Sequence, residues 1–296
     1  MSTTTGRMTL QEEQQARIAI NYLRQFVERA RVFFFECQER PGPGSSAARA
    51  QANRDLVLVL DASLLHDAAS DYFITIVNEF VQGPLPRFSL YALVRGALEA
   101  DAWACWLLDP RIDDTRRLER TLTLRSNSLF EMKRMGLPTA RTSASHYRKR
   151  IKRVLTAGKR WKLTRKTHKH GLETFGDLPK VTPLLRSLLA EISAENKQLT
   201  VGEQTYGELS ARAHGTTWAL LSRLTPIARL SQFRQMGYSL LDVAELIRLL
   251  GVAVHLHDKA TTWMALLAGI EPDVWQRQRG DLPWPVPGGP LVIPGH

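Results

Sequence analysis

The chain lacks several features that would reveal a function at once. It has only two cysteines in 296 residues, Cys37 and Cys105, and both lie within apolar helical patterns. Two buried thiols favour a reducing compartment and support neither a disulfide framework nor a zinc cluster. Gly-rich phosphate loops, a serine nucleophile elbow and Cys-x-x-Cys spacing are also missing. The sequence therefore provides none of the usual motifs of nucleotide-binding, hydrolase or thiol-redox proteins.

Long apolar runs are missing as well. A helix that crosses a bilayer needs roughly 18 or more consecutive apolar residues. The most apolar stretch, Leu56 to Val81, is interrupted by Asp61, Asp67 and Asp71. The first residues show neither a basic start followed by an apolar core nor a small-residue cleavage site. We therefore expect a cytoplasmic protein without a membrane partner.

Acidic residues are absent from one segment. Met132 to Leu172 holds fourteen Lys and Arg and no Asp or Glu, although the whole chain has a formal charge of +11. The remainder holds 26 basic against 29 acidic residues, a net charge of −3. The basic character is thus a local property, which indicates either one segment with an anionic partner or a solvated insertion.

This basic segment also carries aromatic residues, Tyr147 and Trp161. Basic side chains bind phosphate backbones and aromatic rings stack on bases, so the combination predicts contact with RNA. A solvated, partly irregular insertion remains the alternative. The residues that we expect to contact nucleic acid are Arg148, Lys149, Arg150, Lys152, Arg153, Lys159, Arg160, Trp161, Lys162, Arg165 and Lys166.

Apolar residues recur at helical spacing through most of the chain, and Pro/Gly pairs separate these stretches. We find no internal repeat and no convincing strand pattern. The predicted class is all-α: a bundle of roughly seven to eight helices with short Pro/Gly turns, in which neighbours run antiparallel. One domain is expected over 1–280, with a basic, partly irregular insertion at 139–179 and a Pro/Gly-rich tail at 281–296. The predicted helices cover about 9–37, 54–82, 89–109, 113–135, 145–157, 182–195, 203–224 and 239–268.

The helix predicted from Ser89 to Asp109 is the one around which the others are expected to pack. It is apolar on nearly every side and yet carries Arg95 and Glu99 one turn apart. A helix that is apolar all round is normally packed on all sides. Buried charges have to be paired, so we expect Arg95 and Glu99 to form a pair where water is scarce.

A second set of polar residues lies on the helix predicted over 203–224. Tyr206, Ser210 and His214 follow at intervals of four residues and so share one face, which apolar residues flank. Hydroxyl and imidazole groups that face a core need partners, and Arg95 with Glu99 are the candidates. Two interpretations stay open: a pocket in which His214 moves protons and Arg95 holds an anion, or a structural network that fixes the helix register.

Histidines elsewhere give no firm prediction of a metal. His257 lies at the centre of an apolar stripe. This pattern fits either a hydrogen-bonded histidine of the core or a metal ligand. The dipeptides His66-Asp67 and His257-Asp258 invite comparison with metal phosphohydrolases, but no further His and Asp follow at suitable spacing. We therefore predict no metal and no cofactor.

Two of these helices carry a resemblance to known proteins. One has the pattern Arg-x-x-x-Glu and ends in Trp-Leu-Leu-Asp-Pro, from Arg95 to Pro110; the other has Tyr-x-x-x-Ser-x-x-x-His-Gly-Thr, from Tyr206 to Thr216. Together they resemble a mostly actinobacterial family of all-helical proteins. More distantly, residues 54–268 are similar to HEPN-like helical bundles, many of which are RNA-cleaving toxins or antiviral effectors.

This resemblance implies an RNA-directed effector, possibly acting as a metal-independent ribonuclease in a toxin or defence system. In HEPN nucleases an Arg precedes the catalytic His by several positions on one helix. Here Arg212 comes two residues before His214, on nearly the opposite face, so Arg95 would have to take its place. Catalytic roles would then fall to His214, Arg95, Glu99, Tyr206 and Ser210.

The expected partners are RNA, bound through the basic segment, and a second copy of the chain in a homodimer. The alternative is a non-catalytic helical scaffold or a module that binds a small anionic ligand at Arg95. In that case the polar residues would set the specificity of packing or of ligand binding, with no catalysis.

Overall fold

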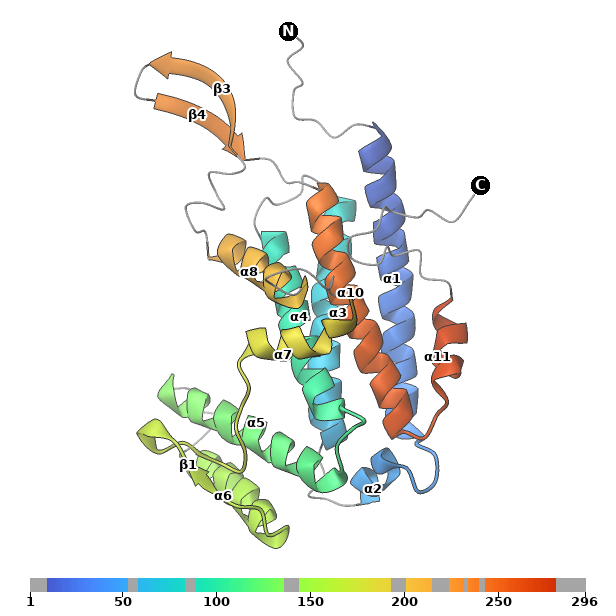
Figure 1. Cartoon of the computed structure of the whole chain (residues 1–296), viewed down its shortest axis with the longest axis vertical. Coiled ribbons are helices and arrows are strands. Elements are labelled where there is room, and N and C mark those ends of the chain that lie inside the picture. Colours follow the sequence, from blue (N-terminus) through green and yellow to red (C-terminus); the bar gives the residue numbers. More distant parts are fainter. Residues whose placement is uncertain are drawn as a thin grey trace.

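The chain folds as a helical bundle, as the sequence predicts. The computed structural model describes residues 10–52, 58–82, 89–135, 144–192, 201–214, 224–231, 234–239 and 243–280. Figure 1 shows four long helices side by side, with the other described helices around them. These four are α1 (Leu10–Glu39), α3 (Leu58–Gln82), α4 (Ser89–Leu108) and α10 (Val243–Leu267).

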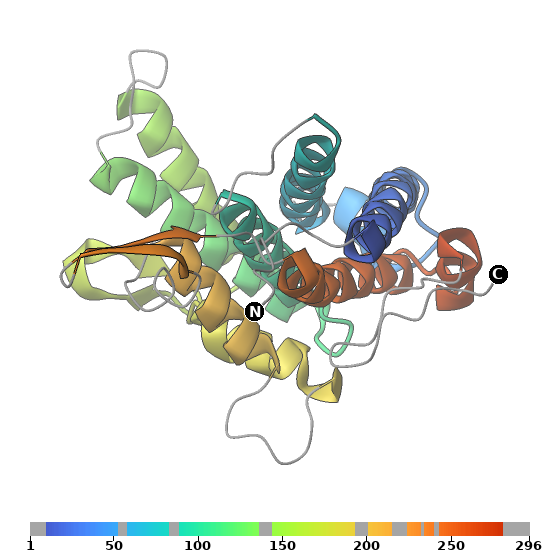
Figure 2. The ribbon, with the colours of Figure 1, turned by 90° about the horizontal axis from the view of Figure 1, so that it is seen from above.

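Six further helices surround this group. In the view from above, α5 and α6 project from one side and α11 covers the opposite side (Figure 2). The helix α6 packs on α5, and α7 and α8 pack on α4. Their bounds are α2 (Ser46–Ala52), α5 (Asp114–Arg134), α6 (Ala144–Arg160), α7 (Val181–Leu188), α8 (Val201–Ala213) and α11 (Pro272–Arg279), and two 3-10 turns cover Lys169–Gly171 and Ala190–Ile192.

The helix α4 lies at the centre of the core. It contacts α3, α5, α7, α8 and α10, and its small residues Ala97, Ala102 and Ala104 are fully buried. Alanine lets helix backbones approach closely, so α3 and α10 can pack against different sides of α4. The prediction of a helix packed nearly all round is therefore confirmed.

The helix α1 packs on α3 and α10, and two of its phenylalanines contact α11. Phe33 stacks on Trp275 of α11, with ring centroids 5.1 Å apart, and Phe26 lies 5.9 Å from the same indole. The indole N–H of Trp275 donates to Asp258 Oδ1 of α10 at 2.7 Å, so this fully buried ring has its polar atom satisfied. The aromatic contacts and this hydrogen bond fix α11 on the bundle.

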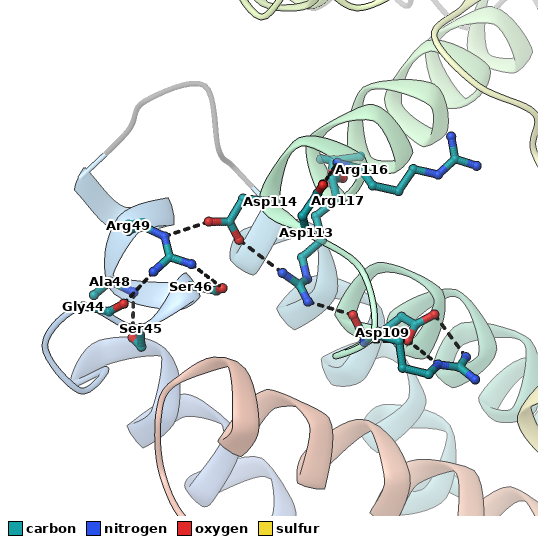
Figure 3. Close-up of polar contacts among 12 residues, drawn as sticks. Gly44, Ser45, Ser46, Ala48, Arg49, Asp109, Asp113, Asp114, Arg116 and Arg117 are labelled. Atoms are coloured by element: carbon teal, nitrogen blue, oxygen red, sulfur yellow. Dashed lines mark hydrogen bonds and ion pairs between the residues drawn. The ribbon is translucent and has the colours of Figure 1, made fainter.

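A chain of charged groups joins the start of α5 to α2 and to the end of α4 (Figure 3). Asp114 accepts from Arg49 at 2.7 Å and from Arg117 at 3.1 Å. Arg117, which is buried, also donates to the backbone carbonyl of Asp109 at 2.8 Å. Asp113 caps α5 by accepting the backbone N–H three residues further along. Burial raises the pKa of Asp114, but hydrogen bonds from Arg49 and Ser46, together with the charges of Arg49 and Arg117, outweigh burial and leave the pKa lowered.

Two short helices were not predicted from the sequence. The loop expected around 41–53 contains α2, and α11 follows the last predicted helix. They have seven and eight residues. Two helical turns are too short for the periodicity of apolar residues to reveal, and in isolation such segments are marginal helices. Tertiary contacts with the bundle decide their conformation.

The structure also contains strands, which the sequence analysis did not predict. β1 (Lys166–Thr167) and β2 (Glu173–Thr174) pair within the basic insertion, and β3 (Leu224–Ser231) pairs antiparallel with β4 (Arg234–Ser239). Pro226 in β3 argues against a strand, because proline is confined to edges and bulges. It is tolerated because β3 has β4 as its one partner, with a register shift beside Pro226.

Other boundaries differ by smaller amounts. The helix predicted over 203–224 ends at Ala213 in α8, while α6 continues three residues past the predicted end to Arg160. The prediction for residues 215–223 and that for the tail at 281–296 lie outside the described residues. Within the described ranges, no helix is long and apolar enough to cross a membrane.

The contact between α6 and the segment after β2 yields a test of this packing. A Cβ added to Gly158 in α6 would lie 2.1 Å from the ring of Phe175, which is buried. We predict that Gly158→Ala lowers the free energy of unfolding by about 1–3 kcal/mol, because the Phe175 ring has to leave its packed position to admit the methyl group. Urea denaturation followed by circular dichroism measures this change.

Gly207→Ala is the matched control. Gly207 lies inside α8 and an added Cβ meets nothing within 4 Å. Alanine is the better helix former, so this variant should be as stable as the wild type or up to about 1 kcal/mol more stable. Equal destabilisation by the two substitutions would mean that the Phe175 contact is not formed.

Candidate functional site

The residues predicted to meet between the two motif helices do meet. The Arg95 guanidinium of α4 donates from Nε to Glu99 Oε1 at 2.7 Å and from Nη2 to the Tyr206 hydroxyl at 3.2 Å. Its Nη1 lies 2.7 Å from Nε2 of His214, which follows the end of α8. Tyr206 in turn donates to Glu99 Oε1 at 2.9 Å. We call Arg95, Glu99, Tyr206 and His214 the Arg95 cluster.

The positions of these groups follow from helix geometry. Arg95 and Glu99 are one turn apart on α4, where side chains four residues apart face each other. The hydroxyl of Tyr206 reaches across from α8, and its ring lies under the guanidinium, 5.2 Å from the ring centroid to Cζ. Every nitrogen of the Arg95 side chain therefore has a contact within the cluster.

The cluster is less dry than the sequence suggests. The side chains of Arg95 and Glu99 are 21% and 32% exposed, and His214 is exposed. The expectation that Arg95 and Glu99 lie where water is scarce is therefore wrong in degree. Both residues lie near the middle of α4, where α8 packs on one side. Their exposed fractions show that solvent reaches this edge of the bundle.

Ser210 has a different position from the other four residues. Its backbone carbonyl accepts the backbone N–H of His214 at 3.0 Å. This bond is an i to i+4 helical bond that holds His214 one turn beyond Ser210, although the helix ends at Ala213. Ser210 thus helps to place the imidazole.

The contacts define which atoms carry protons. A guanidinium has donors only, so its contact with His214 requires a lone pair on Nε2 and places the imidazole proton on Nδ1. Burial lowers the pKa of Arg95, but hydrogen bonds to Tyr206 and Glu99 outweigh it and raise the pKa overall. Burial, followed by the bond to Glu99, raises the pKa of the Tyr206 hydroxyl. The cluster presents a permanent cation beside a neutral imidazole.

Arg212 does not take part in this cluster. Its guanidinium is buried, donates to Glu245 of α10 at 2.5 Å and lies 4.6 Å from the ring centroid of Tyr91. The spacing of two residues predicts that Arg212 and His214 point to different sides of α8. Arg212 pairs with Glu245 of α10, whereas His214 contacts Arg95 of α4. If an arginine assists His214, it is Arg95.

The basic side chains predicted to contact nucleic acid lie on the surface, and most come from α6. The predicted residues Arg148 through Lys166 are exposed except for Trp161, which is half-buried with Tyr147 against the core cluster. The apolar side of α6 faces α5, and the hairpin β1–β2 follows it. Arg165 pairs with Glu173 and Lys166 with Asp177 at 2.7 Å, so the charge of these two residues is partly compensated.

A groove of about 950 Å³ runs between α3, α5 and α6. Its floor is apolar and includes Leu64, a side chain 59% exposed. Lys149, Arg153 and three other basic residues of α6 form its rim. The one acidic residue lining it, Asp61, is bound by Arg125 at 2.6 and 2.7 Å. The groove therefore offers a positive rim over an apolar floor.

The groove and the Arg95 cluster lie apart. Figure 1 shows α6 beside α5 at the lower end of the bundle, while α8 lies beside the upper half of α4. Both features were expected to bind one RNA, but they do not share a pocket.

A second polar cluster, which the sequence analysis missed, lies deep in the core. His66 of α3, Asp101 of α4 and His257 of α10 are buried, and each offers a ligand-type atom such that these atoms lie within 4.8 Å of one another. His257 Nδ1 lies 2.9 Å from Asp101 Oδ2, and the two imidazole rings are 4.0 Å apart. We call these three residues the core triad.

Asp101 was the signal that could have revealed this triad. It lies in a helix that is apolar on nearly every side and, unlike Glu99, has no opposite charge one turn away. A carboxyl group in that position requires a partner from another helix. Histidines spaced far apart along the chain gave no hint that they were the partners, because only packing brings α3 and α10 to the same side of α4.

Burial sets the protonation of the core triad. Burial lowers the pKa of His257 to about 3 and lowers that of His66 well below its ordinary value. Burial also raises the pKa of Asp101 well above its ordinary value. All three side chains are thus neutral in the folded state. The free energy of unfolding therefore depends on pH wherever the unfolded chain binds a different number of protons from the folded chain.

This protonation predicts a loss of stability in mild acid. The histidines take up protons in the unfolded chain below the ordinary pKa of 6.5 but not in the folded state, so their contribution is complete above pH 6.5 and lost as the pH falls. Asp101 acts in the opposite sense, since its raised pKa favours the folded state at low pH. Two histidines outweigh one carboxyl, and we expect a net fall of about 1.4 kcal/mol per pH unit below 6.5.

Urea unfolding at pH 6.5, 5.5 and 4.5 in the presence of EDTA measures the slope. His257→Gln should remove most of it, while His255→Gln, on the same helix but beside Glu191 at the surface, should keep it. A slope that is the same in both variants would contradict the neutral buried histidine.

Comparisons with known proteins add no assignment. No model of a protein family, no curated protein and no solved structure matches this chain. The resemblance to HEPN-like bundles therefore stays a prediction from sequence motifs, and the function has to be argued from the two clusters and the groove.

Proposed function

We propose that the chain is an RNA-directed effector of the HEPN-like type and that it cleaves RNA without a metal at the Arg95 cluster. The observation that supports this most is the 2.7 Å contact between the Arg95 guanidinium and His214 Nε2 at an exposed edge of the bundle. A cation beside a neutral imidazole suits acid–base chemistry on a phosphodiester.

In this proposal His214 acts as the base. Nε2 takes the proton of an RNA 2′-hydroxyl, whose oxygen attacks the adjacent phosphorus. The bond from phosphorus to the 5′-oxygen breaks, the leaving oxygen takes a proton from water, and a 2′,3′-cyclic phosphate results. Arg95 turns its Nη1 donor from the imidazole to the phosphate oxygens and stabilises their charge, while Glu99 and Tyr206 hold the guanidinium in place.

The basic insertion would bind the backbone of the same RNA at a distance. Because α6 lies beside α5 and away from α8 (Figure 1), the nucleotides held by α6 are not those that are cleaved. An extended strand running along the bundle would contact both features. Such an effector belongs in the cytoplasm, where RNA is available and the buried thiols of Cys37 and Cys105 stay reduced.

The second candidate is a non-catalytic scaffold or a module for a small anion. One observation favours it: Arg95 is already bound by Glu99, Tyr206 and His214, as in a structural network that fixes helix register. In that case loss of Arg95 leaves Glu99 without its cationic partner and destabilises the fold, and no activity is lost. A small anion at Arg95 would instead raise the melting temperature.

RNA cleavage by the purified protein decides between them. We expect the wild type to cleave a labelled single-stranded RNA in the presence of EDTA, and His214→Ala and Arg95→Ala to lower the rate by about 100-fold or more, because each removes a group needed in the transition state. His255→Ala, which removes another surface-accessible histidine, should keep the wild-type rate. Gel analysis of the products, including the cyclic phosphate end, measures the outcome.

Equal rates in the wild type and the two cluster variants would remove the catalytic assignment. Melting temperatures recorded on the same samples test the scaffold. No cleavage in any protein, together with a loss of about 1–3 kcal/mol in Arg95→Ala, would establish the structural role instead.

RNA binding at α6 makes a separate prediction. Affinity for single-stranded RNA should fall as salt rises, with a slope of log affinity against log salt of about −0.7 per phosphate contact. Lys149→Gln with Arg153→Gln, both on the groove rim, should reduce the slope by about 1.4. Arg24→Gln with Arg277→Gln removes equal charge from exposed helical pairs elsewhere and should leave it unchanged. Fluorescence anisotropy over a salt series measures it, and salt-independent binding would contradict an electrostatic grip.

A further inference from the structure

We propose that the core triad of His66, Asp101 and His257 is a binding site for a divalent first-row transition-metal ion, which links α3, α4 and α10 in the middle of the bundle. The ion would take one nitrogen from each histidine and one oxygen from Asp101. This site is distinct from the Arg95 cluster, and its function would be structural.

The geometry of the triad carries the proposal. His257 Nδ1 and Asp101 Oδ2 are 2.9 Å apart, about 0.5 Å less than the separation of two tetrahedral ligands that each lie about 2.0–2.2 Å from one zinc ion. The third ligand atom, from His66, completes a set within 4.8 Å. Small rotations of side chains bring it into range. Metal sites in helical bundles are built in this way, from inward side chains on facing helices.

Unsatisfied atoms point to the same conclusion. His66 Nδ1, Asp101 Oδ1 and His257 Nε2 are each buried without a hydrogen-bond partner in the described part of the chain. Three such atoms in one cluster are unusual, because buried polar groups in folded proteins are nearly always paired. An ion held between His257 Nδ1, Asp101 and His66 would supply the interaction that His66 Nδ1 lacks; it would not reach His257 Nε2, which lies on the other side of its ring.

Thr261 prepares His66 for this role. Its hydroxyl donates to the His257 backbone carbonyl at 2.9 Å and lies 3.2 Å from His66 Nε2. Since the hydroxyl has only one proton, its oxygen must accept from His66, and Nε2 carries the imidazole proton. His66 Nδ1 is then left with a lone pair. A second hydrogen bond that fixes the tautomer in this way is typical of histidine ligands.

The surroundings define the class of ion. Phe34 lies 4.1 Å from the His66 ring, and Phe26 and Phe73 lie 5.8 and 5.3 Å from the His257 ring, measured between ring centroids. In this apolar shell a divalent ion would neutralise an ionised Asp101. Two imidazoles and one carboxylate are ligands that suit Zn²⁺ and its neighbours, rather than Ca²⁺ or Mg²⁺.

Metal content of the full-length protein tests the proposal. We would produce it in media supplemented with Zn²⁺ or Co²⁺, wash it with a chelator to remove surface ions, and measure metal by mass spectrometry. The wild type should retain about one equivalent, and the Co²⁺ form should show visible absorption bands of a low-coordinate nitrogen and oxygen site. Thermal unfolding should occur at a higher temperature in the metal-loaded protein than in protein made without metal.

Variants locate the ion. Asp101→Asn and His257→Gln should lose the metal and the absorption bands, and Thr261→Val, which keeps all three ligands, should weaken affinity by about 10–100-fold. His255→Gln and His214→Gln should bind as the wild type does, which excludes the surface and the Arg95 cluster. If the core variants do not fold, the wild-type spectrum and thermal shift decide alone. The proposal would be overturned if the wild-type protein retained no metal or showed no absorption bands. It would also be overturned if Asp101→Asn kept the metal content of the wild type.

Discussion

Burial of α4 is the constraint on which the rest of the structure depends. The helix is enclosed by α3, α5, α7, α8 and α10, so each polar group that it carries has to find a partner on a neighbouring helix or lie at an edge. Arg95 and Asp101 follow these two routes. They are six residues apart on one helix, about 9 Å along its axis, and yet one faces an open edge and the other the centre of the core.

These two positions give the clusters different chemistry. At the edge, water and ligands can reach a cation and an imidazole, and Glu99 and Tyr206 hold the cation without removing its charge. In the core, burial keeps His66, Asp101 and His257 neutral, and the energy of the site depends on hydrogen bonds and on any ion that takes their place. Reaction at a surface is therefore proposed for the first cluster and stabilisation of helix packing for the second.

The basic insertion adds a third feature beside the two clusters. The helix α6 packs its apolar side against α5, and its charged side chains are exposed and include those that line the groove. Such an arrangement leaves the charge available to an anionic partner. Its distance from the Arg95 cluster means that a partner which uses both must be extended, as a single strand of RNA is.

The amino-acid sequence by itself determined the helical class, the bounds of the long helices and the meeting of Arg95 with Glu99, Tyr206 and His214. Each follows from local periodicity, or from the need of a charge in an apolar helix for a partner. Tertiary structure alone decided the short helices α2 and α11, whose two turns carry too little periodicity, and the pairing of β3 with β4 across Pro226. It also decided the core triad, because His66 and His257 are 191 positions apart along the chain and only the packing of α3 and α10 around α4 brings their side chains to Asp101.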